Sequence, residues 1–378
     1  MKIGNGTTQE IKEVPISDNL VGQISTALAD IADISAIFTS KREILIKAIP
    51  LSTHDDLRTV LESRLSAFGY KPEILSTYPT LIIRLRSYSS SRPRSIPWTN
   101  IVLFLLTVIS TLCAGALQEG VNWFSNPGIF LSNPMLIISR GFPFSFSLLA
   151  ILLCHESGHY ITSRIHGVNV SLPYFIPAPT WIGTLGAVIR SRSAFMNRKQ
   201  LLDVGASGPL AGLLIAIIVY SIGIHNSQIL PLPSSGAHDI MVFGDSLLAK
   251  FITYLVRGPI PNGMAVYESS VAFAGWVGLL VTMLNLLPIG QFDGGHIMYA
   301  LFGRKQVYLA NAVLVALIVL SFWWLGWAIW LVLAIIMKPA HPPTLMDEEP
   351  LSRGRRLIGY LSIAAFIVCF VPVPVSSL

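Results

Sequence analysis

Charged residues are scarce in this sequence. Only 12% of its 378 residues are Asp, Glu, Lys or Arg, whereas 52% are hydrophobic, and the mean hydropathy is +0.63. A soluble protein contains about 25% charged residues. The chain is therefore predicted to be an integral membrane protein. Its net charge of +6 is small for this length, which argues against a nucleic-acid-binding surface.

Cysteine is also rare. Cys113, Cys154 and Cys369 are the only three, and all of them fall in apolar segments. An odd and scattered set of this kind argues against a disulfide framework. The sequence begins without a basic-flanked apolar segment, so we expect no cleavable signal peptide.

The few charges are concentrated at the N-terminus. Residues 1–94 contain 12 Lys/Arg and 10 Asp/Glu, which is 22 of the 46 charged residues of the chain. Residues 42–49 alternate like a strand, residues 55–68 have the apolar spacing of a helix, and residues 70–86 resemble one or two further strands. We therefore expect a small soluble α+β domain over residues 1–94, followed by a linker rich in Ser, Pro and Arg.

The remainder, residues 95–378, contains apolar segments of bilayer length, about 20 residues each. The predicted spans are residues 98–117, 142–165, 204–224, 271–287, a pair of short helices within 308–337, and 357–371. A hairpin is preferred for 308–337 because a single span would place the basic residues at its two ends on opposite sides of the membrane. The predicted fold class is an α-helical polytopic membrane protein with about seven transmembrane segments, or six as the alternative, and a small N-terminal α+β domain.

The basic residues also predict an orientation. Two groups flank the first three spans: Arg84, Arg86, Arg92 and Arg94, and then Arg164, Arg190, Arg192, Arg198 and Lys199. The positive-inside rule places both groups in the cytoplasm, so we expect a cytoplasmic N-terminus and a C-terminus outside the cell membrane. Residues 246–256 are apolar but too short to cross, and they predict an interfacial or re-entrant helix.

Ionisable residues interrupt the second predicted span, in the sequence HESGH. His155 and His159 are four residues apart, so on a helix they lie on one face and can share one cation. Glu156 lies about 100° around the helix, which suits it to act on a water molecule at the metal rather than on the metal itself. A charge at mid-bilayer costs about 2.5–3.5 kcal/mol, so these residues are functional candidates. H-E-x-x-H is the short motif of zinc metallopeptidases, and it predicts Zn²⁺ as the cofactor.

A catalytic zinc ion needs a third protein ligand and an open position for water. The fourth span ends in NLLPIGQFDGGH, which contains Asn285, Pro288 and Asp293. Pro288 breaks the helix, and a carboxylate just past such a break can turn back toward a neighbouring helix. Both motifs lie at the cytoplasmic ends of their predicted spans, so they can meet at one depth. Asp293 is the predicted third ligand, and a helix cap after Pro288 is its alternative role.

Together these motifs resemble the site-2 protease family of intramembrane zinc metalloproteases. The small-residue segment GASGPLAG between them and His166-Gly167 after the first motif add to this resemblance, which covers residues 142–296. The sequence GTLGAVIRSRS is similar to the archaeal and plastid branches of the family. No PDZ-like insertion and no C-terminal regulatory module are visible, so substrate selection cannot be transferred from the family.

The resemblance implies a role for each motif residue. His155, His159 and Asp293 would bind zinc, and Glu156 would be the catalytic acid/base. Asn285 would lie near the substrate, with satisfaction of backbone groups freed by the proline as its alternative role. The implied catalytic core spans residues 142–303.

Other residues are predicted to have structural roles. Gly205, Gly208 and Gly212 are expected to allow close helix packing without touching the site. His296 is expected to be an interfacial histidine, since a fourth protein ligand would close the site. Cys154 points away from the face of the two motif histidines and is expected to be a small apolar filler.

The cytoplasmic loop after the second span predicts a substrate-binding element. Residues 184–192 alternate like a strand and follow the proline-rich sequence PYFIPAPTW. We expect a hairpin whose open edge binds an unwound substrate by strand addition. The alternative is a plain loop whose arginines fix topology and bind anionic lipid headgroups.

Two classes of function are compatible with these features. The first is an intramembrane zinc metalloprotease that cleaves peptide bonds within or near transmembrane segments, with membrane proteins and the lipid bilayer as its partners and no nucleic acid. The second is a non-hydrolytic zinc-binding transporter or an inactive homologue. A transporter should contain internal repeats with paired broken helices, and neither motif has a second copy here, so the protease is favoured.

Overall fold

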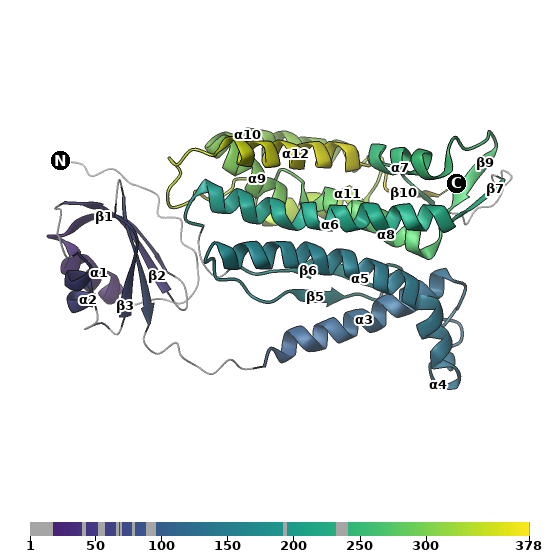
Figure 1. Cartoon of the computed structure of the whole chain (residues 1–378), viewed down its shortest axis with the longest axis horizontal. Helices are drawn as coiled ribbons and strands as arrows, with labels where there is room; N and C mark the ends of the chain where they lie inside the picture. The colour runs from purple at the N-terminus through teal and green to yellow at the C-terminus, as the bar shows by residue number, and fades with distance from the viewer. Residues whose placement is uncertain are drawn as a thin grey trace. The chain divides into compact units, whose positions relative to one another are not determined.

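The computed structural model describes residues 18–39, 43–51, 57–65, 68, 70–77, 80–87, 96–191, 195–231 and 241–377. These residues form two compact units, which meet in sequence between Ile96 and Pro97 (Figure 1). Most of the predicted linker, residues 88–95, lies outside the described residues, as does the C-terminal Leu378.

The N-terminal unit is a four-stranded antiparallel sheet with two helices on one face. Its elements are α1 (Asp18–Leu28), β1 (Ala32–Thr39), β2 (Glu43–Pro50), α2 (Leu57–Leu65), β3 (Tyr70–Ser76) and β4 (Leu81–Ser87). The strand order is β1-β2-β4-β3. Apolar side chains of α1 and α2 form one core with alternate residues of the two central strands, β2 and β4. The predicted helix and strands from residue 42 onward are confirmed, whereas α1 and β1 were not predicted.

The second unit is mainly helical. Its helices are α3 (Trp98–Gln118), α4 (Ile129–Ser132), α5 (Pro134–Ile165), α6 (Arg198–Asn226), α7 (Leu247–Arg257), α8 (Ser270–Asn285), α9 (Asp293–Phe302), the 3₁₀ turn η3 (Gly303–Lys305), α10 (Gln306–Leu320), α11 (Gly326–Ile336) and α12 (Arg353–Cys369). Its short strands are β5 (Tyr174–Pro177), β6 (Thr184–Val188), β7 (Gln228–Pro231), β8 (Met241–Phe243), β9 (Met264–Tyr267) and β10 (Val375–Ser377).

Several helices of this unit can cross a membrane. Within the described residues, four segments are long and apolar enough by length and composition: α3, α5, α6 and Asp293–Leu320, which joins α9 to α10. Helices α8 and α11 are apolar but shorter. A multi-pass membrane protein is thus confirmed, and the count of seven spans stays a prediction.

The predicted boundaries differ from the observed ones mainly in α5. This helix has 32 residues and begins at Pro134, eight residues before the predicted start at 142, and it contains Pro143 in its interior. The predicted break within 308–337 is present, because α10 ends at Leu320 and α11 begins at Gly326. The short helix predicted at 246–256 is α7, which packs beside α6 and α12 (Figure 1).

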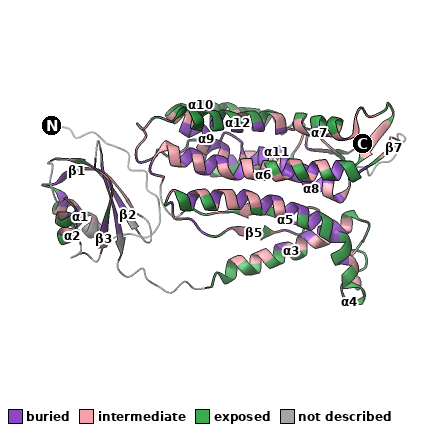
Figure 2. Cartoon of the chain, viewed as in Figure 1, coloured by how far each residue is buried: buried purple, intermediate pink, exposed green. Residues whose placement is uncertain are grey.

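Helix α6 is the centre of the second unit. It contacts α5, α8, α9, α7 and α12, and buried residues concentrate in this interior, whereas exposed residues follow the outer sides of α3 and α10 (Figure 2). Lipid chains are as apolar as leucine, so close approach and hydrogen bonds, rather than removal of apolar area from water, hold membrane helices together. Gly158 shows this for α5 and α6, because a Cβ added there would lie 2.5 Å from the carbonyl oxygen of Ser207.

The hairpin predicted after the second span is present. β5 and β6 pair in antiparallel register, and the hairpin is tied to α3 by three side chains of that helix. Asn100 donates to the Pro173 carbonyl at 2.8 Å, Ser110 to the Gly183 carbonyl at 2.6 Å, and Gln118 to the Trp181 carbonyl at 3.1 Å. The hairpin is therefore anchored to α3 by residues that are spread along most of that helix.

Candidate metal centre

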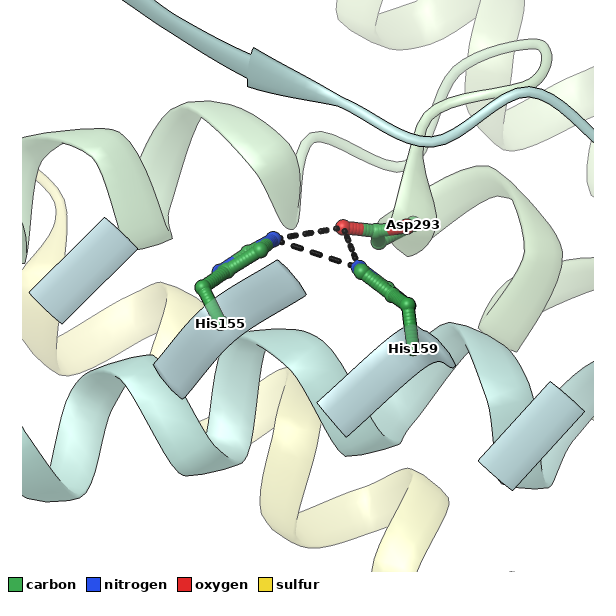
Figure 3. Close-up of side chains that lie close together, drawn as sticks. All are labelled: His155, His159 and Asp293. Atoms are coloured by element: carbon green, nitrogen blue, oxygen red, sulfur yellow. Dashed lines mark hydrogen bonds and ion pairs between the residues drawn. The ribbon is translucent and has the colours of Figure 1, made fainter. Parts of the chain in front are cut away.

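Three ionisable side chains from two helices converge in the second unit (Figure 3). His155 and His159 project from α5, and Asp293 is the first residue of α9. Nε2 of His159 lies 3.2 Å from Nε2 of His155 and 3.2 Å from Oδ2 of Asp293, and the His155–Asp293 distance is 3.5 Å. Among the residues that the structure describes, no other group of three His, Cys, Asp or Glu side chains has metal-ligand spacing.

These side chains fit a zinc ion. Tetrahedral zinc with bonds of about 2.0–2.1 Å separates its donor atoms by about 3.3–3.4 Å. The three donor atoms are 3.2 to 3.5 Å apart, which matches that separation. Two imidazole nitrogens and one carboxylate oxygen form the donor set of a catalytic site, in which the fourth position is open to water or substrate.

A hydrogen bond orients His159 toward this centre. Nδ1–H of His159 donates to the Val204 carbonyl of α6 at 2.8 Å, which leaves the Nε2 lone pair for a metal. A carbonyl partner of this kind fixes the tautomer and ring orientation of a metal-binding histidine. The Asn285 side-chain amide lies 3.3 Å from Nε2 of His155. Helices α5, α6, α8 and α9 therefore all contribute to the site.

Glu156 lies beside the three convergent residues but is not one of them. Its side chain is only 4% exposed, and its Oε2 atom is buried without a hydrogen-bond partner in the described structure. A buried carboxylate oxygen without a partner is costly, so such an atom in a native protein calls for an explanation. This oxygen can accept a proton or a hydrogen bond from a bound molecule.

The glycines of α6 touch the site directly, so the prediction that they only support it from a distance is wrong. A Cβ added to Gly208 would lie 2.1 Å from Nε2 of His159, and one added to Gly212 would lie 3.1 Å from Nδ1 of His155. A Cβ added to Gly205 would lie 2.9 Å from the Cβ atom of His296. The small-residue face of α6 is therefore the surface on which the histidine rings rest.

The remaining candidates occupy the edges of the site. Asn285 faces His155 rather than the backbone freed by Pro288, which favours a role at the site over its alternative. His296 is outside the convergent group, and its Nδ1 atom lies 2.6 Å from Nε2 of His341. Cys154 is half-buried and makes no metal-site contact within the described residues.

Sequence reasoning missed Val204, which orients His159, and His341, which contacts His296. Val204 acts through its backbone carbonyl, which no side-chain pattern can indicate. His341 follows the apolar helix α11 by five residues and carries no motif of its own.

Comparison with known proteins finds similarity to one family of peptidases. Residues 143–325 match the model described as peptidase family M50. The chain is 27% identical over 295 residues to "Probable zinc metalloprotease EGY1, chloroplastic" of Oryza sativa subsp. japonica, covering 72% of this chain and 50% of the relative. It is 31% identical over 245 residues to "Probable zinc metalloprotease EGY2, chloroplastic" of Arabidopsis thaliana, covering 62% and 42%. The chain thus spans about half the length of the curated relatives that it matches.

Proposed function

Because the chain belongs to the site-2 protease family, peptidase family M50, in its plastid-like branch, we propose that it is an intramembrane zinc metalloprotease. Its substrates would be membrane proteins, cleaved within or near their transmembrane segments. The observation that carries this proposal is the convergence of His155, His159 and Asp293 beside the buried, unpartnered carboxylate of Glu156. Membership of a peptidase family argues against the alternative function, a non-hydrolytic zinc-binding transporter.

The proposed mechanism assigns one task to each side chain. His155, His159 and Asp293 would hold zinc, which would supply Lewis acidity toward water and the scissile carbonyl. Glu156 accepts the proton of the attacking water on Oε2 and returns it to the leaving amine. Asn285, next to His155, binds the substrate backbone.

The β5–β6 hairpin supplies a binding edge for the substrate in this proposal. A transmembrane helix hides its carbonyls in its own hydrogen bonds, so it must unwind before attack. β5 packs against α3 and contains Pro177, which lacks an N–H donor, whereas β6 has no proline. Leu185 and Val188 of β6 are 72% and 53% exposed. We therefore expect the unwound substrate to pair with β6. The alternative is a plain loop whose arginines bind lipid headgroups, and a crosslink between the substrate and β6 would argue against it.

We also propose a division of the chain into domains and an orientation in the membrane. Residues 1–94 would form a soluble cytoplasmic domain that tunes substrate access or assembly. Residues 95–378 would form the transmembrane protease domain, with residues 142–303 as its catalytic core. The support is the charge density of the first segment and the Arg/Lys distribution of the loops.

Loss of a metal ligand tests the proposed function. Asp293→Ala should lower zinc affinity more than about tenfold, because changes to the outer shell alone typically cost 10–100-fold. Cleavage of a model transmembrane substrate should fall in parallel. Zinc per protein and cleavage rate are measured on the same purified sample, with Glu119→Ala, an exposed carboxylate at the end of α3, as the control. Unchanged zinc content in Asp293→Ala would place the third ligand elsewhere.

Cysteine accessibility tests the orientation. In a variant without the three native cysteines, Arg190→Cys should react with an impermeant maleimide only after the membrane is opened, and Leu378→Cys should react in intact cells. The reason is the positive-inside rule, which places the basic loop containing Arg190 in the cytoplasm. Labelling of position 190 from the outer face would reverse the proposed topology.

A further inference from the structure

The chain between α11 and α12 forms a strap beside the metal site. The strap is defined here as residues 338–349, and it lies beyond residues 143–325, which match the family model. It contacts the loop that leads to Asp293, then α9, and then the segment that begins α6. Each of these three elements carries or supports a proposed metal ligand.

The first contact joins the strap to the loop before Asp293. The Gly290 N–H donates to the Pro339 carbonyl at 3.1 Å, and a Cβ at Gly290 would lie 2.5 Å from the Lys338 carbonyl oxygen. Gly290 also has φ +53°, a conformation that favours glycine. The loop can therefore lie against the strap only because this residue has no side chain.

Gln306 reinforces that contact from α10. Its side chain is 2% exposed, and its amide nitrogen donates to the Pro339 carbonyl at 3.1 Å and to the Pro288 carbonyl at 3.5 Å. Its amide oxygen accepts the His341 N–H at 3.3 Å. One amide group thus connects the strap with the loop. Irregular backbone at membrane depth is tolerated only where protein or water satisfies it, and here protein does so.

The second contact joins His341 to α9. Nδ1–H of His341 donates to the Pro342 carbonyl at 2.6 Å, so its Nε2 atom accepts from Nδ1–H of His296, also at 2.6 Å. Burial lowers the pKa of His341 to about 3, so this ring is neutral and keeps its acceptor at neutral pH. The ring also stacks on Tyr299, with centroids 4.7 Å apart. His296 and Tyr299 both follow Asp293 on α9.

The far end of the strap binds the segment that begins α6. The Tyr299 hydroxyl donates to Asp347 at 2.6 Å, and the Met346 N–H donates to the Met196 carbonyl at 2.7 Å. Glu349 accepts from Asn197 at 3.0 Å and pairs with Lys199 at 3.0 Å. The strap therefore links the helix that begins with Asp293 to the helix whose backbone orients His159.

We propose that the strap positions the carboxylate of Asp293 for metal binding, with His341 and Gln306 as its positioning residues. Asp293 follows an irregular loop, and Phe292 before it offers no side-chain cap to α9. The contacts with the strap therefore act together with the packing of α9 against α6 to place this loop and helix. A metal site must hold its ligands to within about 0.5 Å, so loss of these contacts should loosen the metal. The inference rests on the proposed role of Asp293 as a ligand.

Two substitutions of His341 separate positioning from packing. His341→Phe keeps a flat ring on Tyr299 but removes the acceptor, whereas His341→Gln offers an amide oxygen to the His296 N–H and loses the ring. Zinc affinity of the purified full-length protein is measured by competition with a chromophoric chelator. We expect zinc affinity to fall about tenfold in His341→Phe and to be largely restored in His341→Gln.

Gln306→Leu, which removes the other contact at similar volume, should also weaken zinc binding and gives a second measurement if His341→Phe does not fold. His225→Phe, an exposed histidine at the end of α6, is the control.

The outcomes distinguish this inference from the proposed function. Wild-type affinity in both His341→Phe and Gln306→Leu would overturn the positioning role while leaving the protease proposal intact. A larger loss in His341→Gln than in His341→Phe would show that only ring packing matters and would also overturn it. A wild-type protein that binds no zinc would instead overturn the proposed function.

Discussion

Glu156→Gln should abolish cleavage while zinc stays bound. The amide has the shape and size of the carboxyl group but cannot accept a proton from water, and a positioned general base typically contributes about 10²–10⁴-fold to the rate. Glu156 is not among the three convergent donor residues, so its replacement leaves the metal ligands in place. The measurement is zinc per protein together with the rate of cleavage of a model transmembrane substrate.

A matched control is available within the same chain. Glu268 is half-buried and also has a buried Oε2 atom without a hydrogen-bond partner in the described structure, but it lies before α8, and Tyr220 donates to its other oxygen at 3.1 Å. Burial raises the pKa of Glu268 to about 7, so the neutral form that glutamine imitates is already populated. Glu268→Gln should therefore cleave at the wild-type rate. Full activity in Glu156→Gln would remove the proposed mechanism.

The half of the site that depends on local geometry could be predicted from the sequence. His155 and His159 are one helical turn apart, and the structure places them on one face of α5 as that spacing requires. Asp293 could be inferred from the break at Pro288 because a zinc site needs a third ligand. Its place 3.2 Å from His159 depends on how α9 packs, which the motif does not specify.

The contacts between helices depend on the register of one helix along another, and they could not be predicted from the sequence. Which carbonyl of α6 receives the His159 ring depends on how far α6 slides along α5, and apolar periodicity does not encode that offset. For the same reason, the glycines of α6 were predicted to be packing residues. The predicted start of α5 at residue 142 is eight residues too late, because the helix continues on the N-terminal side of Pro143, and membrane helices tolerate an interior proline when neighbours satisfy the freed backbone.

Gly208→Ala should destroy the metal site through a single methyl group. An added Cβ would lie 2.1 to 2.5 Å from three atoms of the His159 ring, and real Cβ contacts are essentially never this short. The ring must therefore leave the Val204 carbonyl or push α5 away from α6. Zinc affinity and cleavage should both fall at least about 10–100-fold, the cost of losing the orientation of a metal-binding histidine.

Two other glycines control for the general effects of this change. Alanine is a better helix former than glycine by about 1 kcal/mol, so Gly354→Ala in α12, where an added Cβ meets nothing within 4 Å, should leave zinc and activity unchanged. Gly212→Ala should have an intermediate effect, because its Cβ would lie 3.1 Å from the nearest His155 atoms and a small shift can relieve that contact. Zinc content and cleavage rate are compared across the three variants after each is shown to be folded. Equal zinc content in Gly208→Ala and Gly354→Ala would mean that the His159 ring does not rest on α6 when the metal is bound.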